Sequence, residues 1–303
     1  MAVPHYDAVV IGAGNGGLAA ALTLVNAGKK VLLAERHNLP GGFATSFIRG
    51  RFEFEASLHE LCDMGTPGNS GNLYDLFEEL GVLDKIEFVT VPEAYRGISL
   101  STGEDYTMPF GIENFIDKME SYVPGSREST TTFFELAGEC RRAMSYLTKS
   151  RGNPDTAVLK SEYPNFMRVA AYPIDKVLDA IKMPKKAQEI LNVYWSYLGT
   201  PEDQLSFLHY ALMVWLYVSL GAQVPKNRSH GISCALADTI LEKGGEIWYN
   251  SEVEHIITKD GHVAGVRFAD GKEVATEHIV SNASPHLVYG SMVDAKDIPE
   301  EEL

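Results

Sequence analysis

Cysteine and basic residues are both scarce in this 303-residue sequence. The three cysteines, Cys62, Cys140 and Cys234, are widely separated and form no Cys-x-x-Cys pair. That spacing argues against a disulfide framework and favours free thiols in a reducing compartment, so we expect a cytoplasmic protein. Lys and Arg number 26 against 41 Asp and Glu, which gives a net charge of −15. We expect no nucleic-acid partner, because phosphate binding needs concentrated positive charge.

Metal-ligand and nucleophile motifs are absent from the sequence as well. The nine histidines form no His-x-x-x-His pair, and no Gly-x-Ser-x-Gly elbow is present. We therefore expect no metal site. Redox chemistry on a bound organic cofactor needs neither motif, because the cofactor performs the reaction and the protein positions it.

Residues 204–225 form a run without any formal charge, and its length reaches the usual threshold for a membrane span. His209, Gln223 and other polar residues interrupt the run, and it lies between two parts of one predicted domain. We favour a buried helix that lines an apolar cavity, with Phe207 to Leu220 as part of its wall. Transient contact with a membrane surface remains open.

Three glycines follow directly on an apolar segment near the N-terminus. Residues 8–11 are continuously apolar, as expected for a strand buried on both faces of a parallel sheet. Gly12, Gly14 and Gly17 then give the pattern Gly-x-Gly-x-x-Gly at the start of a predicted helix. In such a turn the first glycine permits the tight bend, the second lets the backbone approach a pyrophosphate, and the third lets the helix pack close to the strand.

A second buried strand at residues 30–34 ends at Glu35 and completes a β–α–β unit. The helix N-terminus, which includes Asn15 and Gly16, offers unpaired N–H groups and a partial positive charge to a pyrophosphate. Glu35 can accept hydrogen bonds from the ribose hydroxyls of a nucleotide. A glycine-rich turn without a ligand is the alternative, and the order of elements disfavours it. The sequence therefore predicts a Rossmann-type dinucleotide site.

The rest of the chain divides by its pattern. Helical segments dominate residues 95–224, with several proline and glycine breaks. Asp-Gly turns at 260–261 and 270–271 predict a three-stranded meander. A final apolar strand at 279–280 runs into Ser281-Asn282-Ala283. Both ends of the chain thus contribute to one dinucleotide domain, and a mainly helical domain is inserted between them.

A family resemblance decides between cofactors. Glu35-Arg36, Leu39-Pro40-Gly41-Gly42 and Phe52-Glu53-Phe54-Glu55 resemble the opening of the phytoene desaturase family. That group includes carotenoid isomerases and retinol saturase, within the wider amine-oxidase-like flavoproteins. The resemblance is specific at both ends of the chain and looser through the central helices.

The resemblance implies FAD as the cofactor. It implies an α/β fold in which residues 1–94 and 225–290 form a discontinuous Rossmann-type FAD-binding domain and residues 95–224 form the substrate domain. The family places a Gly-Gly loop beside the FAD phosphates, and the backbone of a residue at the Val253 position against the adenine. The cofactor-binding residues expected on this basis, together with the glycine motif, are Gly12, Gly14, Asn15, Gly16, Gly17, Glu35, Arg36, Gly41, Gly42, Phe43, Ala44, Thr45, Val253, Asn282 and Ala283.

Two positions depart from the family pattern. Phe43 stands where the family often has arginine, and Ser57 stands where a glycine is common. Both positions approach the flavin ring in the family. His59 keeps its family position near the flavin and is the candidate catalytic residue. A packed, hydrogen-bonded histidine that shapes the pocket is the alternative, and we favour it.

The expected activity is that of an FAD-dependent oxidoreductase that desaturates or saturates C–C bonds of an apolar polyene or isoprenoid substrate. A redox-neutral isomerase belongs to the same class. An amine-oxidase-like flavoenzyme and a nucleotide-binding fragment without turnover are the alternatives.

Residues 291–303 resemble the start of a further C-terminal segment. The family continues with a glycine-rich strand-to-helix turn, and nothing after Ala283 matches it. We therefore expect weak FAD retention and little turnover from these residues alone, unless a partner chain completes the site.

Overall fold

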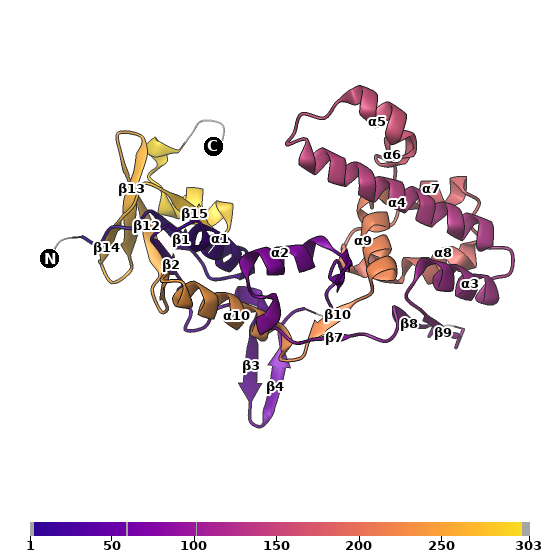
Figure 1. Ribbon diagram of the computed structural model, residues 1–303, viewed down its shortest axis with the longest axis horizontal. Helices are drawn as coiled ribbons and strands as arrows, with labels where there is room; N and C mark the ends of the chain where they lie inside the picture. The colour runs from indigo at the N-terminus through magenta and orange to yellow at the C-terminus, as the bar shows by residue number, and fades with distance from the viewer. Residues whose placement is uncertain (1–2, 59, 101, 299–303) are drawn as a thin grey trace. The chain divides into compact units, whose positions relative to one another are not determined.

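The structure is a computed structural model that describes residues 3–58, 60–100 and 102–298. The chain divides into two units. Unit 1 comprises residues 1–59, 75–89 and 224–303, and unit 2 comprises residues 60–74 and 90–223. Both the indigo N-terminal part and the yellow C-terminal part of the ribbon belong to unit 1 (Figure 1).

A four-stranded parallel sheet forms the centre of unit 1. Its strands are β1 (Ala8–Ile11), β2 (Val31–Ala34), β11 (Glu246–Trp248) and β15 (Ile279–Ser281), in the order β11-β2-β1-β15. β1 and β2 are buried along their whole length, as their unbroken apolar sequences predict. Helix α1 (Asn15–Asn26) connects β1 to β2 and packs against both strands and against α10 (Arg228–Glu242).

An antiparallel meander packs on the sheet. It consists of β12 (Val253–Lys259), β13 (His262–Phe268) and β14 (Glu273–Ala275). The turn between β12 and β13 has positive φ at both Asp260 and Gly261, the backbone that an Asp-Gly turn favours. Alternate residues of β1 and β2 pack with the meander in one hydrophobic core. The buried residues of this core are Tyr6, Val9, Ile11, Leu32, Ala34, Val253, Ile256, Val266, Phe268, Val274 and Met292.

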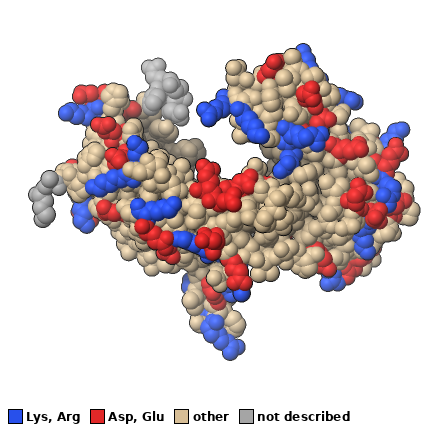
Figure 2. All heavy atoms as spheres, in the orientation of Figure 1, with Lys and Arg blue, Asp and Glu red and all other residues tan. Residues whose placement is uncertain are grey.

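Smaller elements complete unit 1. A hairpin of β3 (Ser46–Arg49) and β4 (Phe52–Glu55) extends from it, and Lys and Arg side chains gather at the hairpin's free end (Figure 2). Helix α2 (Asn72–Leu80) spans the boundary of the two units. The short strands β7 (Phe88–Thr90) and β10 (Gln223–Pro225) also include residues of both units, whereas β5 (Gly65–Thr66) and β6 (Asn69–Ser70) belong to unit 2.

Unit 2 is mainly helical. Its helices are α3 (Ile112–Tyr122), α4 (Arg127–Lys149), α5 (Thr156–Glu162), α6 (Pro164–Val169), α7 (Ile174–Ala180), α8 (Lys185–Leu191) and α9 (Phe207–Leu220). A hairpin of β8 (Tyr95–Ile98) and β9 (Asp105–Met108) precedes them. One large core runs through the unit and is rich in aromatic rings.

The segment 60–74 belongs to unit 2, although the sequence analysis places it in the dinucleotide domain. Long-range hydrogen bonds hold it there. Leu61 and Gln223 exchange backbone hydrogen bonds of 2.8 and 3.0 Å, and the Gln223 Nε2 donates to the Gly65 carbonyl at 2.9 Å. Such pairings between distant residues leave no trace in local periodicity.

Helix α9 is the buried helix that the sequence predicts over residues 207–220. Its buried side chains are Phe207, Tyr210, Ala211, Val214, Tyr217 and Val218, and they join the core of unit 2. No residue of α9 is among the lining residues of the two cavities described below, and a cavity wall along α9 stays a prediction. α9 has 14 residues, and among the described residues no helix has both the length and the apolar character to cross a membrane.

Candidate nucleotide-binding site

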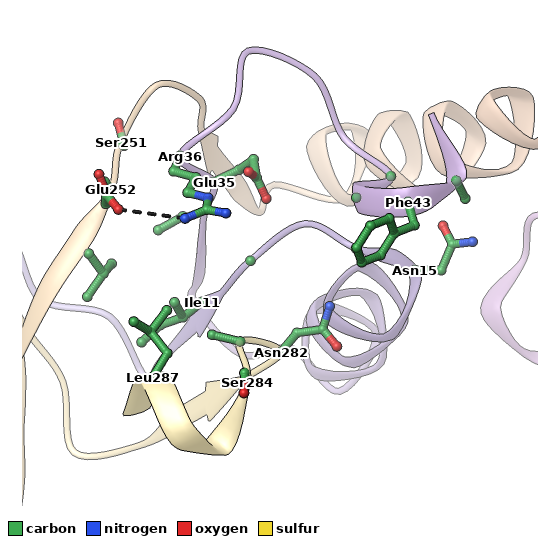
Figure 3. Close-up of a pocket in the computed structure, with 18 of the residues that line it drawn as sticks. Ile11, Asn15, Glu35, Arg36, Phe43, Ser251, Glu252, Asn282, Ser284 and Leu287 are labelled. Atoms are coloured by element: carbon green, nitrogen blue, oxygen red, sulfur yellow. Dashed lines mark ion pairs between the residues drawn. The ribbon is translucent and has the colours of Figure 1, made fainter. Parts of the chain in front are cut away.

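A cavity of about 580 Å³ opens in unit 1 at the carboxyl ends of β1 and β2. Five segments that are distant in sequence line it: the β1–α1 turn, the end of β2 with the loop that follows, Ser57 after β4, the start of β12, and the residues after β15. The carboxyl edge of a parallel sheet is the usual position of a ligand in an open α/β fold. Figure 3 shows Arg36, Ser251 and Glu252 at one end of this cavity, and Asn15 and Phe43 at the other.

The β1–α1 turn tolerates only glycine at key positions. Gly12 has a φ of +92°, and a Cβ on Gly17 would lie 1.9 Å from the Gly12 carbonyl oxygen. Gly17 therefore lets α1 begin directly against the turn. The first turn of α1 contains no acidic residue and has no side-chain cap, so its leading N–H groups keep their capacity to bind an anion.

A second glycine loop lies directly against the first. The Gly41 amide donates to the Ala13 carbonyl at 2.7 Å. A Cβ on Gly42 would approach the Gly14 Cα to 3.2 Å. The structure thus brings together two glycine pairs that the sequence separates by a helix and a strand. Their shared surface is backbone, which allows close approach by a ligand.

Glu35 links the end of β2 to the glycine turn. Its carboxylate accepts hydrogen bonds from the Ala13 amide at 2.6 Å and from the His37 amide at 2.7 Å. The side chain is only 8% exposed, yet it lines the cavity. Each carboxylate oxygen has two lone pairs, so the group can still accept hydrogen bonds from ligand hydroxyls.

Arg36 and Glu252 form the rim at the same end. Their side chains make a long ion pair of 3.9 Å between exposed groups. The backbone between β11 and β12 is fixed beside them, because the Ser251 amide donates to the Glu35 carbonyl at 2.8 Å. This bond places Val253, the first residue of β12, in the cavity wall.

Asn282 lies under the glycine turn at the end of β15. Its amide donates to the Ile11 carbonyl at 2.8 Å, which extends the pairing of β15 with β1. A Cβ on Gly14 would lie 2.6 Å from the Asn282 Nδ2, so this carboxamide closely borders the turn. On α1, the Asn15 Oδ1 accepts a hydrogen bond of 2.8 Å from the Ser233 hydroxyl of α10.

The cavity collects most of the residues that the sequence analysis proposes for the cofactor. Gly16, Gly17 and Thr45 are not among its lining residues, and Gly17 packs behind the turn. His59 lies outside the described residues. The predicted residues that line the cavity are Gly12, Gly14, Asn15, Glu35, Arg36, Gly41, Gly42, Phe43, Ala44, Val253, Asn282 and Ala283.

Sequence reasoning missed several lining residues. Glu252 and Ser251 precede Val253 directly, and the polar character of that pair was the available signal. Leu287 and Met292 also line the cavity from the segment after β15. Nothing in their local sequence distinguishes them from ordinary apolar residues.

Burial favours the neutral state of two side chains in unit 1, Tyr249 and Cys234. Burial raises the pKa of the Tyr249 hydroxyl, with further contributions from Cys234, Asp238 and Glu35. Burial also raises the pKa of the Cys234 thiol, and Asp238 adds to the shift. Both groups therefore stay protonated at neutral pH and can donate hydrogen bonds. Among the described residues, no cluster of His, Cys, Asp or Glu could hold a metal ion.

Comparisons with known proteins agree with this geometry. Residues 10–80 match the family described as an NAD(P)-binding Rossmann-like domain. The chain is 26% identical to prolycopene isomerase 2, chloroplastic, of an Oncidium hybrid cultivar, over 98% of this chain and 51% of that protein. It is 24% identical to the all-trans-retinol 13,14-reductase of Danio rerio, over 93% of this chain and 48% of that protein. The chain resembles carotenoid isomerases and retinol reductases.

These relatives confirm the resemblance inferred from the sequence, and the chain spans about half of their length. Solved structures confirm the fold. The PF1083 protein of Pyrococcus furiosus matches with a TM-score of 0.66 at 18% identity, over 97% of this chain and 63% of that chain. A putrescine oxidase bound to putrescine matches with a TM-score of 0.63 at 16% identity, over 98% of this chain and 62% of that chain.

Proposed function

We propose that the protein is an FAD-dependent oxidoreductase that desaturates or saturates C–C bonds of an apolar polyene or isoprenoid substrate. The observation that carries this proposal is the cavity of unit 1, where two glycine loops, Glu35 and the start of β12 meet. The names of the two relatives indicate that one acts on a polyene and the other on a retinoid, and this supports the proposed substrate class.

The residues present fit FAD. The adjoining loops at Gly14 and Gly42 leave only backbone beside the N-terminus of α1, which suits a pyrophosphate. Glu35 would hold the adenosine ribose, and the backbone of Val253 would border the adenine. The second glycine loop and the strand that leads to Asn282 favour FAD over NAD(P), because a simple dehydrogenase needs neither.

Bound FAD would supply the hydride-transfer chemistry for which this chain needs no reactive side chain of its own. The chain's task is positioning. α1 would neutralise the pyrophosphate charge, and Glu35, which two backbone amides hold in place, would fix the ribose. Phe43 lines the cavity away from Glu252 and is 90% exposed, so its ring is free to cover part of a bound ligand.

An amine-oxidase-like flavoenzyme is the second candidate, because a putrescine oxidase shares the fold. A nucleotide-binding chain without turnover is the third. The test is anaerobic mixing of FAD-loaded protein with retinol, with a linear polyene and with a panel of amines, while the flavin absorbance is followed. Bleaching by a polyene supports the proposal. Reoxidation of chemically reduced flavin by retinol or the polyene supports saturation. Bleaching by amines alone supports the oxidase, and a bound flavin that no compound bleaches or reoxidises, without any product, supports the third candidate. Product analysis after chemical reduction of the flavin would reveal a redox-neutral isomerase.

The proposal includes a cytoplasmic location and transient contact with a membrane surface. The β3–β4 hairpin is the surface suited to that contact, since Phe47, Ile48, Phe52 and Phe54 are 44 to 66% exposed. Arg49 and Arg51 stack over two of these rings near the turn. Aromatic and arginine side chains are favourable at a lipid interface. Flotation with anionic vesicles tests the contact, and a protein that stays unbound would contradict it.

A further inference from the structure

Unit 2 contains a second cavity, of about 460 Å³, between α4, α6 and α7. All of its lining residues belong to unit 2, so it is separate from the cavity of unit 1. Its apolar lining comes from Leu136, Val169, Val177, Ala180 and Ile181. A volume of this size lies within the range of sites for small organic molecules, roughly 300–1,000 Å³.

The charged lining residues of this cavity are both cations, Arg168 and Lys176. Lys176 has an ion pair of 3.3 Å with its neighbour Asp175. The exposed side chain of Arg168 makes no hydrogen bond or ion pair with any described residue. A guanidinium group beside apolar walls and without a carboxylate partner is suited to bind one, because its planar donors match a carboxylate in pairs.

A buried carboxylate on α4 has other partners and forms no ion pair with Arg168 among the described residues. Glu139 of α4 is 8% exposed and accepts hydrogen bonds from the Asn165 amide at 2.6 Å, the Asn165 Nδ2 at 2.8 Å and the Phe166 amide at 2.9 Å. These three bonds hold the N-terminus of α6 and occupy both oxygens of the carboxylate. Arg168 occupies the other end of the same short helix, where a cation also interacts favourably with the last carbonyl groups.

We propose that this cavity binds an amphipathic anion, namely a carboxylate with an unbranched apolar tail. Arg168 pairs with the carboxylate at the mouth, and the tail lies against Leu136, Val169 and Val177. Lys176 adds a second positive charge at this cavity, although the net charge of the protein is −15. The inference does not depend on flavin binding in unit 1.

Calorimetric titration of the protein with sodium dodecanoate tests the proposal. The expected result is saturable binding of one molecule per chain. Butyrate has the same head group without the tail, and dodecyltrimethylammonium has the tail with the opposite charge. Both are expected to bind at least about tenfold more weakly, as loss of one charge-assisted hydrogen bond or of several buried methylene groups implies.

Three variants locate the site. Arg168→Gln removes the head-group partner and is expected to weaken dodecanoate binding about tenfold. Lys149→Gln makes the same change in net charge outside the cavity and is expected to bind as the parent protein does. Ala180→Trp fills the cavity from its exposed rim and is expected to abolish binding.

Thermal unfolding of each variant shows whether it is folded. The proposal is overturned if dodecanoate does not bind, if Arg168→Gln and Lys149→Gln bind alike, or if folded Ala180→Trp retains the parent affinity. Equal binding of dodecyltrimethylammonium would overturn the assignment of an anion. An altered melting temperature of Arg168→Gln with unchanged dodecanoate affinity would leave Arg168 only a helix-terminal role, which also overturns it.

Discussion

Unit 1 and unit 2 fill their interiors differently. In unit 1 the glycines at positions 12, 14, 41 and 42 replace side chains with backbone around a cavity. In unit 2 the rings of Phe115, Phe133, Phe134 and Phe207 are at most 4% exposed, with centroids 5.3 to 5.8 Å apart and edge-to-face geometry. Backbone groups at a cavity can form hydrogen bonds with the polar groups of a ligand, whereas rings packed edge to face bury a large apolar area. Substitutions around the glycine-lined cavity of unit 1 should therefore change mainly ligand affinity, and those in the aromatic core of unit 2 mainly stability.

The largest effect is expected from Phe133→Ala in α4. Phe133 is fully buried and contacts Phe134 and Phe207 edge to face. Truncation leaves a cavity and should lower the free energy of unfolding by about 3–5 kcal/mol. Urea unfolding measures it, with Glu135→Ala on the exposed face of the same helix as control. If Phe133→Ala lowered FAD affinity without lowering the free energy of unfolding, the assignment of a stability role to the aromatic core of unit 2 would be wrong.

Gly17→Ala should have the next largest effect, on ligand affinity. The added Cβ would lie 1.9 Å from the Gly12 carbonyl oxygen, so α1 must move away from the turn. We expect roughly 100-fold weaker FAD binding, which corresponds to about 2.7 kcal/mol. Gly290→Ala in the same unit is the control, since its Cβ would meet no atom within 4 Å. Undiminished FAD affinity in Gly17→Ala would show that α1 does not bind the pyrophosphate.

Glu35→Ala should weaken FAD binding by about 2 kcal/mol, near the value of hydrogen bonds to a charged acceptor. It removes the acceptor for ribose and also the partner of the Ala13 and His37 amides. The matched control is Glu252→Ala at the rim, where an exposed ion pair of 3.9 Å contributes at most about 1 kcal/mol. If the two variants lost the same free energy of FAD binding, the proposal that Glu35 binds the ribose would be wrong.

Tyr210→Phe should have the smallest effect, about 1 kcal/mol on the stability of unit 2. The buried hydroxyl donates a hydrogen bond of 2.9 Å to the Leu191 carbonyl, which then loses its side-chain partner. Tyr172→Phe is the control, because Tyr172 is 57% exposed. The melting temperature reports the difference. A larger fall for Tyr172→Phe than for Tyr210→Phe would contradict the burial argument.

Local sequence predicted much of unit 1. The strand–glycine–helix order around Gly12 and the Asp-Gly turn at Asp260 depend on backbone requirements that neighbouring residues express. The rim pair Arg36 and Glu252 was not predicted as a pair, because the fold alone brings these residues together. α9 is apolar almost all round, so no periodicity could identify which face enters the core.

The central claim is that the cavity of unit 1 binds FAD along its two glycine loops, and calorimetric titration with FAD, FMN and NAD tests it most directly. ADP serves as a competitor for the adenosine end near Glu35. We predict that FAD saturates a single site, that ADP displaces it, and that FMN and NAD bind at least about tenfold more weakly. Tighter binding of NAD than of FAD, or bound FAD that ADP does not displace, would contradict the claim.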